Sequence, residues 1–576
     1  MAKWFLSAKK ADFFGIAEKY HIDPVIARVM RNRDIVSDEE IDMYLNGNVS
    51  MLHNPMLLKG MDEAVRIVLE KIQEQKKIRI IGDYDVDGIC ATYILYQGIK
   101  SLGGVVDTVI PHRMKDGYGI NEDLIKAAID DGVDTIVTCD NGIAAKEAFV
   151  YAKEAGLTCI VTDHHEVPFE DLKEGRKYIL PKVDAIVDPK QEDCIYPFSE
   201  ICGAYVAYQF IKGLVFSQDK ANSAEGKILL EELLEIAGVA TVCDIMPLKD
   251  ENRIIVKETL KSLKNAKNIG LRALMQVNGI ESDKVTSYSI GFVIGPCMNA
   301  TGRLDTADIS LELLKATSYE AAVVLATQLK DLNTSRKEMT EAGVQKAMDL
   351  LLSGEYDHQK ILVLYLQDVH ESLAGIIAGR VKEKTGKPTF VLTKGEEGVK
   401  GSARSIESYH LYEEMVKCRE LFTKFGGHKM AAGLSLQEEN VDAFRKQIND
   451  NCSLTEDDFE EKVLIDVAMP MSYVTTNFIK QLGILEPFGN GNEKPNFAQK
   501  DLVVQNIIPM GKNGDMARVK VKDEGGNIFE LVAFKNGASL VNEKPDKIDV
   551  IYYPSINEFR GKESLQFIIQ SAKWTK

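Results

Sequence analysis

Short apolar segments alternate with helical segments from about Met61 onward, and this alternation restricts the fold more than any other feature of the sequence. The strand candidates are Ile78–Ile81, Val105–Ile110, Thr135–Thr138, Cys159–Thr162 and Ala185–Val187. The helical segments between and after them are Gly88–Ser101, Asn121–Asp130, Ala144–Glu154 and Gly203–Val215. Strands that are connected through helices form parallel sheets with crossover connections. We therefore predict an α/β domain that is built on a parallel sheet.

The rest of the chain differs in pattern from this segment. The N-terminal stretch contains helical segments near Phe13–Tyr20 and Pro24–Met30. Ser318–Leu352 has no proline and one glycine, with apolar residues at helical spacing, which predicts a helix too long for one compact core and therefore a bridge between two lobes. A second α/β block begins at Lys360, and residues 460–576 are rich in strands and glycine turns, which favours a small β-barrel.

The composition is that of a folded, soluble protein. The 576 residues are 45% hydrophobic and 27% charged, which is enough apolar content for several buried cores. No run of about 18 apolar residues occurs, so no membrane span is predicted. The nine Cys are scattered singly without a CxxC pair, which indicates neither a zinc ribbon nor a disulfide framework. We expect a multidomain cytoplasmic protein whose Cys residues are mostly small core residues.

The formal net charge of −17 is unevenly distributed along the chain. Residues 360–450 and 461–576 are each close to +1, whereas residues 1–359 carry about −15. The total charge therefore does not exclude a polyanionic partner, but it requires that any basic surface be local.

Four acidic clusters each follow directly after an apolar segment. In the first, Asp83, Asp85 and Asp87 alternate, so an extended loop would point all three carboxylates to the same side. The other clusters are Asp140-Asn141-Gly142, Asp163-His164-His165-Glu166 and Asp244 with the residues that follow it. Ligands of open parallel sheets bind at the carboxyl ends of the strands. We expect the first three clusters to meet there, with Asp244 closing the site from the next helical segment.

Carboxylates with one or two imidazoles form a mixed oxygen and nitrogen shell, which suits Mn²⁺ or Mg²⁺ better than structural zinc. Close carboxylates repel one another unless cations neutralise them, and two metal ions would do so and would also clamp a phosphoryl oxygen. An EF-hand calcium loop is less favoured, because Tyr93-Ile94-Leu95 occupies the place of its Glu. Asp140 alone fits a helix N-cap equally well, and the pair His164-His165 alone is more often structural. The four clusters together favour a metal site.

Three further segments combine glycines with groups that suit phosphate. They are Gly295–Arg303 with Asn299 and Arg303, Gly401–Ser405 with Ser402 and Arg404, and Phe425–Gly433 with Gly426, Gly427 and His428. We predict loops in which arginine contacts two phosphate oxygens and glycines let backbone N–H groups approach an anion. Each segment taken alone is more often a turn or a helix cap.

The four acidic clusters resemble the motifs of the DHH phosphoesterase superfamily, which is named after the third of them. The segments His370–Arg380 and Phe425–Gly433 look like the DHHA1 domain, and Leu485–Phe497 and Ile556–Phe567 are similar to the C-terminal barrel of the RecJ exonucleases. The resemblance implies an α/β fold with two lobes joined by a long helix, plus an OB-fold barrel. The domains it implies are an N-terminal helical segment (1–60), a DHH domain (61–265), a connecting region with the long helix (266–357), a DHHA1 substrate-binding domain (358–452) and an OB-fold nucleic-acid-binding domain (460–576).

The resemblance also implies roles for individual residues. The metal ligands would be Asp83, Asp85, Asp87, Asp140, His164 and Asp244, and His165 would complete the catalytic set by contacting the substrate phosphate. The other substrate-binding residues would be Asn299, Arg303, Ser402, Arg404, Gly426, Gly427 and His428. One departure is Ile81, which stands where some members have a His. One metal position would then be less well held, or completed by Asp83 or water.

The function that the resemblance implies is a single-stranded-DNA-specific exonuclease. It would act 5′→3′, release 5′-mononucleotides by two-metal hydrolysis with Mn²⁺ or Mg²⁺, and serve DNA repair and recombination. The alternatives are a short-RNA or cyclic-dinucleotide phosphodiesterase with the same site, and a catalytically silent DNA-binding scaffold. The additional barrel argues against the first alternative, and the four intact acidic motifs argue against the second.

Single-stranded DNA is the expected partner. Basic and aromatic residues that suit stacking and backbone contacts interleave in the expected barrel, namely Lys512, Arg518, Lys520, Phe534, Lys535, Phe559, Arg560 and Lys562. A single-strand-binding protein and a helicase are candidate protein partners. No membrane partner is expected, and a monomer is the default expectation.

Overall fold

The computed structural model describes all residues except Met1, Met114, Tyr118, Lys173, Glu174, Glu396, Glu397, Lys512, Asn513, Asn536, Arg560, Thr575 and Lys576. Two of the basic residues expected on the barrel, Lys512 and Arg560, therefore lie outside the described residues, as does the side chain of Phe559. The chain forms two compact units. The larger unit comprises Leu6–Lys330 and Ile465–Lys576, and the smaller unit comprises Met1–Phe5 and Asp331–Leu464. Among the described residues, no helix combines the length and the hydropathy that a membrane span requires.

A five-stranded parallel sheet forms the centre of the larger unit, as the alternating pattern predicts. Its strand order is β3-β2-β4-β5-β8, and every neighbouring pair is parallel. The strands are β2 (Lys77–Ile81), β3 (Val105–Val109), β4 (Thr135–Cys139), β5 (Thr158–Thr162) and β8 (Ala185–Val187). The carboxyl ends of all five strands therefore lie at the same edge of the sheet. An antiparallel hairpin, β6 (Phe169–Leu172) and β7 (Gly175–Tyr178), is inserted between β5 and β8.

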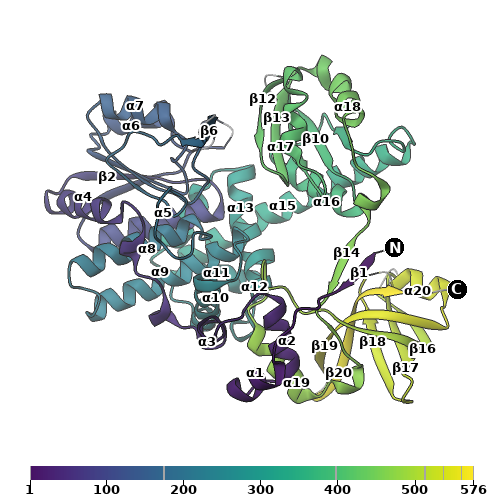
Figure 1. The fold of residues 1–576 in the computed structure, drawn as a ribbon. Coiled ribbons are helices and arrows are strands. Elements are labelled where there is room, and N and C mark those ends of the chain that lie inside the picture. Colours follow the sequence, from purple (N-terminus) through teal and green to yellow (C-terminus); the bar gives the residue numbers. More distant parts are fainter. Residues whose placement is uncertain are drawn as a thin grey trace. The chain divides into compact units, whose positions relative to one another are not determined.

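Helices cover both faces of this sheet, which explains why its strands are almost continuous apolar runs (Figure 1). The larger core contains α4 (Met61–Gln73), α5 (Val86–Ser101), α8 (Gly203–Ser217) and α9 (Ala224–Cys243). The opposite face carries α6 (Glu122–Asp130) and α7 (Lys146–Glu154). Successive side chains of a strand enter the two cores in turn, so that Ile80 packs against the first group and Ile81 against the second.

A series of helices connects this domain to the smaller unit. They are α10 (Asp250–Ser262), α11 (Ile269–Val277), α12 (Ser287–Ser289), α13 (Gly295–Leu304), α14 (Asp308–Lys315) and α15 (Tyr319–Leu352). A π-helical segment, Ile290–Ile294, joins α12 to α13, so residues 287–304 form one continuous helix. The predicted phosphate loop at Gly295–Arg303 is therefore wrong. The predicted long helix is confirmed as α15: Ala322 packs in the core of the larger unit, and Ala347 packs in the core of the smaller one.

A closed β-barrel forms the C-terminal part of the larger unit, which confirms the predicted barrel. Its strands are β15 (Val467–Ala468), β16 (Phe497–Met510), β17 (Met516–Lys522), β18 (Ile528–Ala533), β19 (Lys547–Phe559) and β20 (Lys562–Lys573), with helices α19 (Thr476–Leu482) and α20 (Gly537–Glu543). The sheet order is β15-β16-β17-β18-β20-β19, and the additional pairing of β16 with β19 closes it. In the part of the barrel that the structure describes, β16 to β20 each pair with a strand on both sides, whereas the short β15 pairs with β16 alone.

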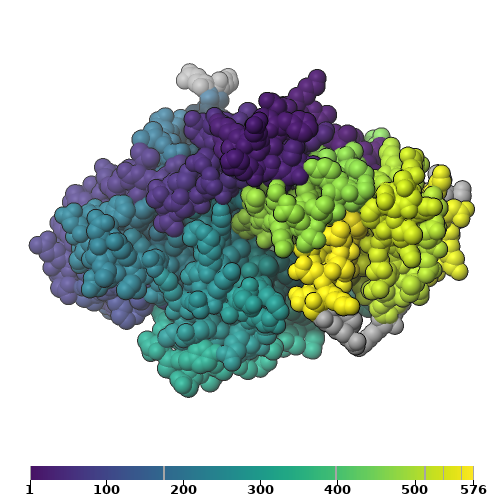
Figure 2. All heavy atoms as spheres, turned by 90° about the horizontal axis from the view of Figure 1, so that it is seen from below, coloured from purple at the N-terminus to yellow at the C-terminus, as the bar shows by residue number. Residues whose placement is uncertain are grey.

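The N-terminal helices share a core with the barrel. These helices are α1 (Phe13–Tyr20), α2 (Pro24–Asn32) and α3 (Asp38–Asn46). Ile26 and Met30 of α2 pack in the same apolar cluster as Val467 and Phe497 of the barrel. In Figure 2 the purple N-terminal helices accordingly lie against the green segment that leads into the barrel.

The smaller unit contains the second α/β fold. Its sheet has the order β12-β13-β11-β10-β9, with β9 and β10 parallel and the other pairs antiparallel. The elements are β9 (Leu362–Tyr365), α16 (Ala374–Thr385), β10 (Thr389–Gly395), β11 (Gly398–Arg404), α17 (Leu411–Val416), β12 (Phe422–Gly427), β13 (Ala431–Leu436) and α18 (Val441–Asp450). A separate two-stranded pair consists of β1 (Lys3–Leu6) and β14 (Lys462–Ile465). The predicted loop at Gly401–Ser405 is wrong, because most of that segment is strand β11.

Candidate metal centre and phosphate pocket

The first acidic cluster links the end of β2 to the start of α5. Asp85 is the N-cap of α5, and its carboxylate accepts hydrogen bonds from the backbone N–H groups of Asp87 and Gly88 at 3.0 and 3.1 Å. Gly88 is needed in this turn, because a Cβ there would lie 2.5 Å from the carbonyl oxygen of Asp83. The alternation of Asp83, Asp85 and Asp87 predicted a loop that stays extended through Asp87, and this prediction is wrong. The helix begins at Val86, and the carboxylate of Asp87 groups with His164 and Asp244, whereas those of Asp83 and Asp85 group with Asp140.

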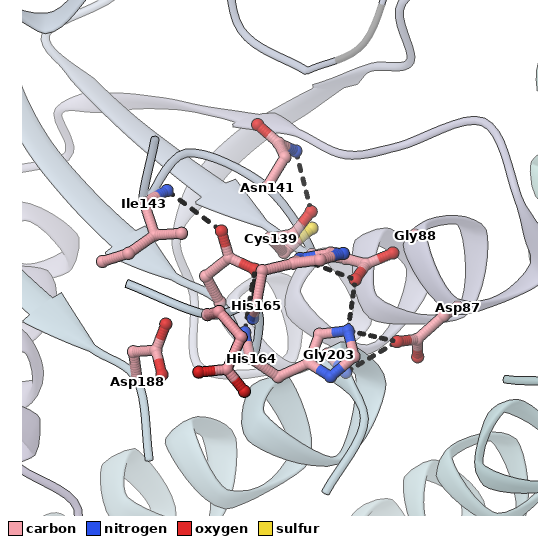
Figure 3. A network of polar contacts seen from close by, with 12 residues as sticks. Asp87, Gly88, Cys139, Asn141, Ile143, His164, His165, Asp188 and Gly203 are labelled. Atoms are coloured by element: carbon pink, nitrogen blue, oxygen red, sulfur yellow. Dashed lines mark hydrogen bonds and ion pairs between the residues drawn. The ribbon is translucent and has the colours of Figure 1, made fainter. Parts of the chain in front are cut away.

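Asp87 instead faces the N-terminus of α8. Its two carboxylate oxygens accept hydrogen bonds from the backbone N–H groups of Gly203 and Ala204, at 2.7 and 2.8 Å (Figure 3). These N–H groups have no partner inside their own helix, and the positive end of the helix dipole stabilises the carboxylate. Gly203 also allows α8 to approach the second cluster, because a Cβ there would lie 2.7 Å from the Cβ of Asp140.

The second cluster follows β4 and is not a helix cap. Asp140 has a left-handed backbone conformation with φ 59°, and α7 begins several residues later without any side-chain cap. The neighbouring Asn141 donates from Nδ2 to the carbonyl oxygen of Cys139 at 2.9 Å (Figure 3) and to that of Ile81 at 3.1 Å. This amide therefore ties the ends of β2 and β4 together, so the position of Asp140 is fixed by the sheet.

The third cluster follows β5, and its aspartate orients its second histidine. Asp163 accepts from the backbone N–H of Ile143 at 3.0 Å and from Nδ1 of His165 at 2.7 Å (Figure 3). This carboxylate raises the pKa of His165 to about 9, against the opposing effect of burial. The imidazole of His164 lies deeper, and burial lowers its pKa, so it is neutral at pH 7. The two histidines are therefore in different protonation states.

The structure brings all seven predicted catalytic residues together. Nε2 of His164 lies 3.1 Å from Oδ1 of Asp140, 3.6 Å from Oδ2 of Asp87 and 3.9 Å from Oδ2 of Asp244. Asp244 reaches this point from the C-terminal end of α9, as expected. Three overlapping groups have ligand atoms within 4.8 Å of one another, namely Asp83/Asp85/Asp140, Asp87/His164/Asp244 and Asp140/His164/His165.

A pocket of about 250 Å³ adjoins the first of these groups. It is lined by Asp83, Tyr84, Asp85, Arg113, Asn299, Gly302 and Arg303. Asn299 and Arg303 reach it from α13, and Oδ1 of Asn299 accepts from the backbone N–H of Val86 at 3.2 Å. The glycines that suggested a loop allow the helix to pack closely instead. A Cβ at Gly302 would lie 2.4 Å from the carbonyl oxygen of Tyr84, and one at Gly295 would lie 2.5 Å from Sγ of Cys243.

The remaining predicted substrate residues lie together on the sheet of the smaller unit. Gly433 of β13 pairs with Ser402 on one side and with Gly426 on the other, and Arg404 pairs with Ala431 in the same ladder. Gly427 has φ 149°, and a Cβ there would lie 2.5 Å from the carbonyl oxygen of Ala431. His428 begins the exposed turn between β12 and β13. The glycines thus form a strand end and a tight hairpin turn.

Comparison with known proteins places three domain families along the chain. Residues 77–241 match the DHH family, N-terminal domain, residues 358–454 match the DHHA1 domain, and residues 465–571 match the RecJ OB domain. The single-stranded-DNA-specific exonuclease RecJ of Bacillus subtilis (strain 168) is 32% identical over 562 residues, which cover 97% of this chain and 69% of that protein. RecJ of Haemophilus influenzae is 32% identical over 566 residues, which cover 95% of each. The chain belongs to the RecJ family.

The fold agrees with this assignment. The crystal structure of RecJ in complex with Mn²⁺ from Thermus thermophilus superposes with a TM-score of 0.84 and 25% sequence identity, covering 100% of this chain and 80% of that one. The predicted family and the predicted fold, two α/β lobes joined by a long helix plus an OB barrel, are both confirmed.

The electrostatics of this RecJ-family centre favour bound cations. Burial, together with the charge of Asp85, raises the pKa of Asp83 to about 8, and burial with the charge of Asp87 raises that of Asp244 to about 8. Burial and the neighbouring carboxylates also raise the pKa values of Asp85 and Asp140. Among the described residues, buried atoms of this cluster without a hydrogen-bond partner include Oδ1 of Asp83, Nδ1 of His164 and Oδ2 of Asp244. Carboxylate oxygens and a neutral imidazole, buried and unsatisfied, fit Mn²⁺ or Mg²⁺.

Two residues of the RecJ-family site were missed in the sequence. Arg113 follows β3, and its guanidinium lies over the ring of Tyr84 at 4.8 Å from the centroid. Asp188 follows β8, is fully buried, and has its pKa raised to about 8 by burial and by the charge of Asp163. Both lie at the carboxyl ends of predicted strands. The rule that located the acidic clusters would therefore have found them, had it been applied to every strand of the sheet.

Proposed function

We propose that this protein is a single-stranded-DNA-specific exonuclease that acts 5′→3′ and releases 5′-mononucleotides, in DNA repair and recombination. The observation that carries the proposal is the meeting of the acidic groups with an arginine-lined pocket at one edge of the parallel sheet. Curated relatives with about one third of their residues identical are named single-stranded-DNA-specific exonucleases. The pocket beside the carboxylates gives this activity a physical basis.

The residues that would hold two divalent ions are Asp83, Asp85 and Asp140 in one group, and Asp87, His164 and Asp244 in the other. When bound, such ions activate a water molecule and neutralise charge on the attacking and leaving oxygens of a phosphodiester. The protein positions these ligands before any substrate arrives. The helix N-termini hold Asp85 and Asp87, and the amide of Asn141 holds the ends of the strands.

Cationic side chains then bind and orient the phosphates. His165 is protonated at neutral pH because Asp163 accepts its Nδ1 proton, and its Nε2 would donate to a non-bridging oxygen. Arg113 and Arg303 line the pocket at the side of Asp83 and fit a terminal 5′-phosphate, which carries more charge than an internal diester. This difference in charge is the physical argument for attack from the 5′ end.

Contacts farther along the strand are assigned to the other domains. In the smaller unit, Ser402, Arg404 and the turn Gly426-Gly427-His428 offer hydroxyl, guanidinium and backbone donors to phosphates. On the barrel, Phe534 is half exposed and lies next in sequence to Lys535, which suits base stacking together with a backbone contact. Arg518 and Lys520 of β17 and Lys562 of β20 would add contacts to the sugar-phosphate backbone.

The test is degradation of single-stranded DNA tagged at the 5′ or the 3′ end, with Mn²⁺ and with EDTA. We expect immediate mononucleotide release from the 5′ tag, complete loss in EDTA, and a loss on the order of 100-fold or more in Asp140→Ala. Asp130→Ala on the exposed end of α6 is the matched control. Release that begins at the 3′ tag would contradict the polarity, and a strand that binds but is never cut would identify a silent scaffold. Hydrolysis of dinucleotides alone would identify the short-substrate phosphodiesterase.

The location, the oligomeric state and the domain boundaries of the protein are also part of what we propose. We propose a cytoplasmic monomer with the domain boundaries 1–60, 61–265, 266–357, 358–452 and 460–576, which acts on strands exposed by a helicase or coated by a single-strand-binding protein. One chain supplies every residue of both metal groups and of the arginine pocket, which supports the monomer. Sedimentation at the concentration of the activity assay tests it, and a dimer at that concentration would contradict it.

A further inference from the structure

A second cavity of the larger unit is lined by the two chain neighbours of the metal-group residue Asp244. Its volume is about 680 Å³, and three parts of the chain line it. Cys243 and Ile245, the residues on either side of Asp244, form one wall. The aromatic rings of Tyr288 and Phe292 form the second, and the loop with Phe488 that leads into the barrel forms the third. Neither the metal groups nor the arginine pocket uses these side chains.

Hydrogen bonds fix the walls of this cavity in place. Nδ2 of Asn490 donates to the carbonyl oxygen of Ile245 at 2.8 Å, and the backbone N–H of Leu248 donates to the carbonyl oxygen of Asn490 at 2.7 Å. On the other side, Oγ of Ser287 donates to the carbonyl oxygen of Phe488 at 2.6 Å. The loop is thus held against both other walls, so the cavity is preformed.

The cavity displays apolar side chains that a folded protein ordinarily covers. Tyr288 and Phe292 stack on each other with ring centroids 4.7 Å apart and an interplanar angle of 19°, yet they are 66% and 63% exposed. Ile245 is 70% exposed and has φ 56°, a left-handed conformation that is rare for a β-branched residue. An exposed apolar cluster of this kind marks an interaction site, and residues held in rare conformations concentrate at functional sites.

The position of the cavity relates it to the path of the substrate. Residues 287–304 form one helix, with Phe292 at the cavity and Arg303 at the phosphate pocket, about 16 Å apart along the axis at 1.5 Å per residue. Asp244, which belongs to the second metal group, lies between two residues that line the cavity. Asp83 and Asp85 line the pocket, and the two chain neighbours of Asp244 line the cavity. A strand with its 5′ end in the pocket would reach the cavity after crossing both groups.

We propose that this cavity is a base-stacking site, in which a nucleobase of the single strand stacks on the Tyr288–Phe292 pair. The inference rests on the proposed function. The charged residues of the cavity, Glu486, Glu493 and Lys494, sum to a negative charge, so the cavity suits an uncharged base rather than a phosphate. Stacking uses the π-face that every base has, so the site would hold any sequence, as a nuclease that degrades whole strands requires. A stacked base would keep the shortened strand in register after each cut.

The experiment places the fluorescent base 2-aminopurine at successive positions of a single strand with non-hydrolysable phosphorothioate linkages. We expect fluorescence quenching on binding at one position or two adjacent positions a few nucleotides from the 5′ end. Phe292→Ala should abolish this quenching and weaken binding about 10-fold, which is within the range for the loss of one stacked base. An abasic site at the quenched position should weaken binding to the wild type by a similar factor, and should have no further effect in Phe292→Ala. Phe14→Ala, an exposed aromatic on α1, is the matched control.

Phe292→Leu gives a second variant that keeps the apolar bulk but removes the ring. We expect it to lose the quenching while keeping the thermal stability of the wild type. Equal quenching in the wild type and in both variants would overturn the proposal. So would an abasic site whose effect on binding adds fully to that of Phe292→Ala. Both results are also those expected if a protein segment, and not a nucleobase, occupies the cavity. These readouts need no hydrolysis. A failure of the exonuclease assay in the wild type would therefore contradict the proposed function separately.

Discussion

Single carboxylates of the metal centre couple the stability of the protein to pH and to cations. The pKa values of Asp83 and Asp244 are raised to about 8 in the folded chain, far above the unfolded value near 3.8. Between these values the unfolded chain has released the protons that the folded chain retains. Stability from this source is therefore fully present below about pH 4 and is lost as the pH rises through about 8. In EDTA we expect the Tm to fall between pH 6 and pH 8.5, and Mg²⁺ to remove most of this fall. Scanning fluorimetry under the four conditions measures it.

One substitution separates this effect from general alkaline destabilisation. Asp83→Asn removes a titrating carboxylate while keeping its size, so in EDTA at pH 8.5 it should raise the Tm by several degrees. The same variant should lose part of the Mg²⁺-dependent stabilisation, because a ligand is gone. Asp123→Asn on the surface of α6 should change neither quantity. A pH dependence in Asp83→Asn equal to that of the wild type would show that the carboxylate is ionised in the metal-free fold.

The helix α13 positions the phosphate pocket through one close backbone contact. Gly302 lies so near the carbonyl oxygen of Tyr84 that a Cβ would approach it to 2.4 Å. Gly302→Ala should therefore push α13 away from the start of α5 and weaken the hydrogen bond from Val86 to Asn299. We expect a stability loss of about 1–3 kcal/mol and at least a 10-fold loss of exonuclease activity, with the larger part in KM. Gly483→Ala, whose Cβ meets no atom within 4 Å, should be neutral in both. Unchanged KM in Gly302→Ala would show that α13 does not set the pocket.

The elements that the sequence predicted well were those with a repeating pattern. The strands of the parallel sheet follow from short apolar runs that alternate with helical segments, and the helix α15 follows from hydrophobic periodicity. The acidic clusters follow from their places after those strands. The prediction failed where a glycine could serve either a loop conformation or the close packing of a helix. In α13, Gly295 and Gly302 permit close helix packing and not a loop. Only the residues packed against them, Cys243 and Tyr84, distinguish close packing from a loop, and these contacts are not visible in the local sequence. The turn of Asp87 toward α8 was also hidden, because the partners of its carboxylate lie 116 and 117 residues away.

At the scale of the whole molecule, a buried arginine connects the phosphoesterase domain to the N-terminal helices and to the segment that precedes the barrel. Arg253 of α10 donates to the carbonyl oxygens of Tyr44, Leu485 and Ile484 at 3.0, 3.0 and 2.9 Å, and its guanidinium lies 3.7 Å from the ring centroid of Tyr44. Arg253, Tyr44 and Leu485 are 2%, 8% and 0% exposed, and Ile484 is partly buried, so these contacts lie largely away from water. One side chain thus satisfies acceptors from two other parts of the larger unit.

This connection predicts how the larger unit unfolds. Arg253→Leu removes the donor from the carbonyl oxygens of Tyr44 and Ile484, whereas the carbonyl oxygen of Leu485 still accepts from Nδ2 of Asn492 at 2.8 Å. We expect a loss of about 2–4 kcal/mol, since each unsatisfied group costs about 1–3 kcal/mol and the effects are not fully additive. In calorimetry of Arg253→Leu, the barrel and the N-terminal helices, which share a core, should unfold in a separate transition before the phosphoesterase domain. Arg66→Leu, which removes only exposed ion pairs with Glu63 and Glu70, should change stability by less than about 1 kcal/mol. If Arg253→Leu unfolds in the same single transition as the wild type, the donors that Arg253 supplies add no coupling between the two domains, and other contacts connect them.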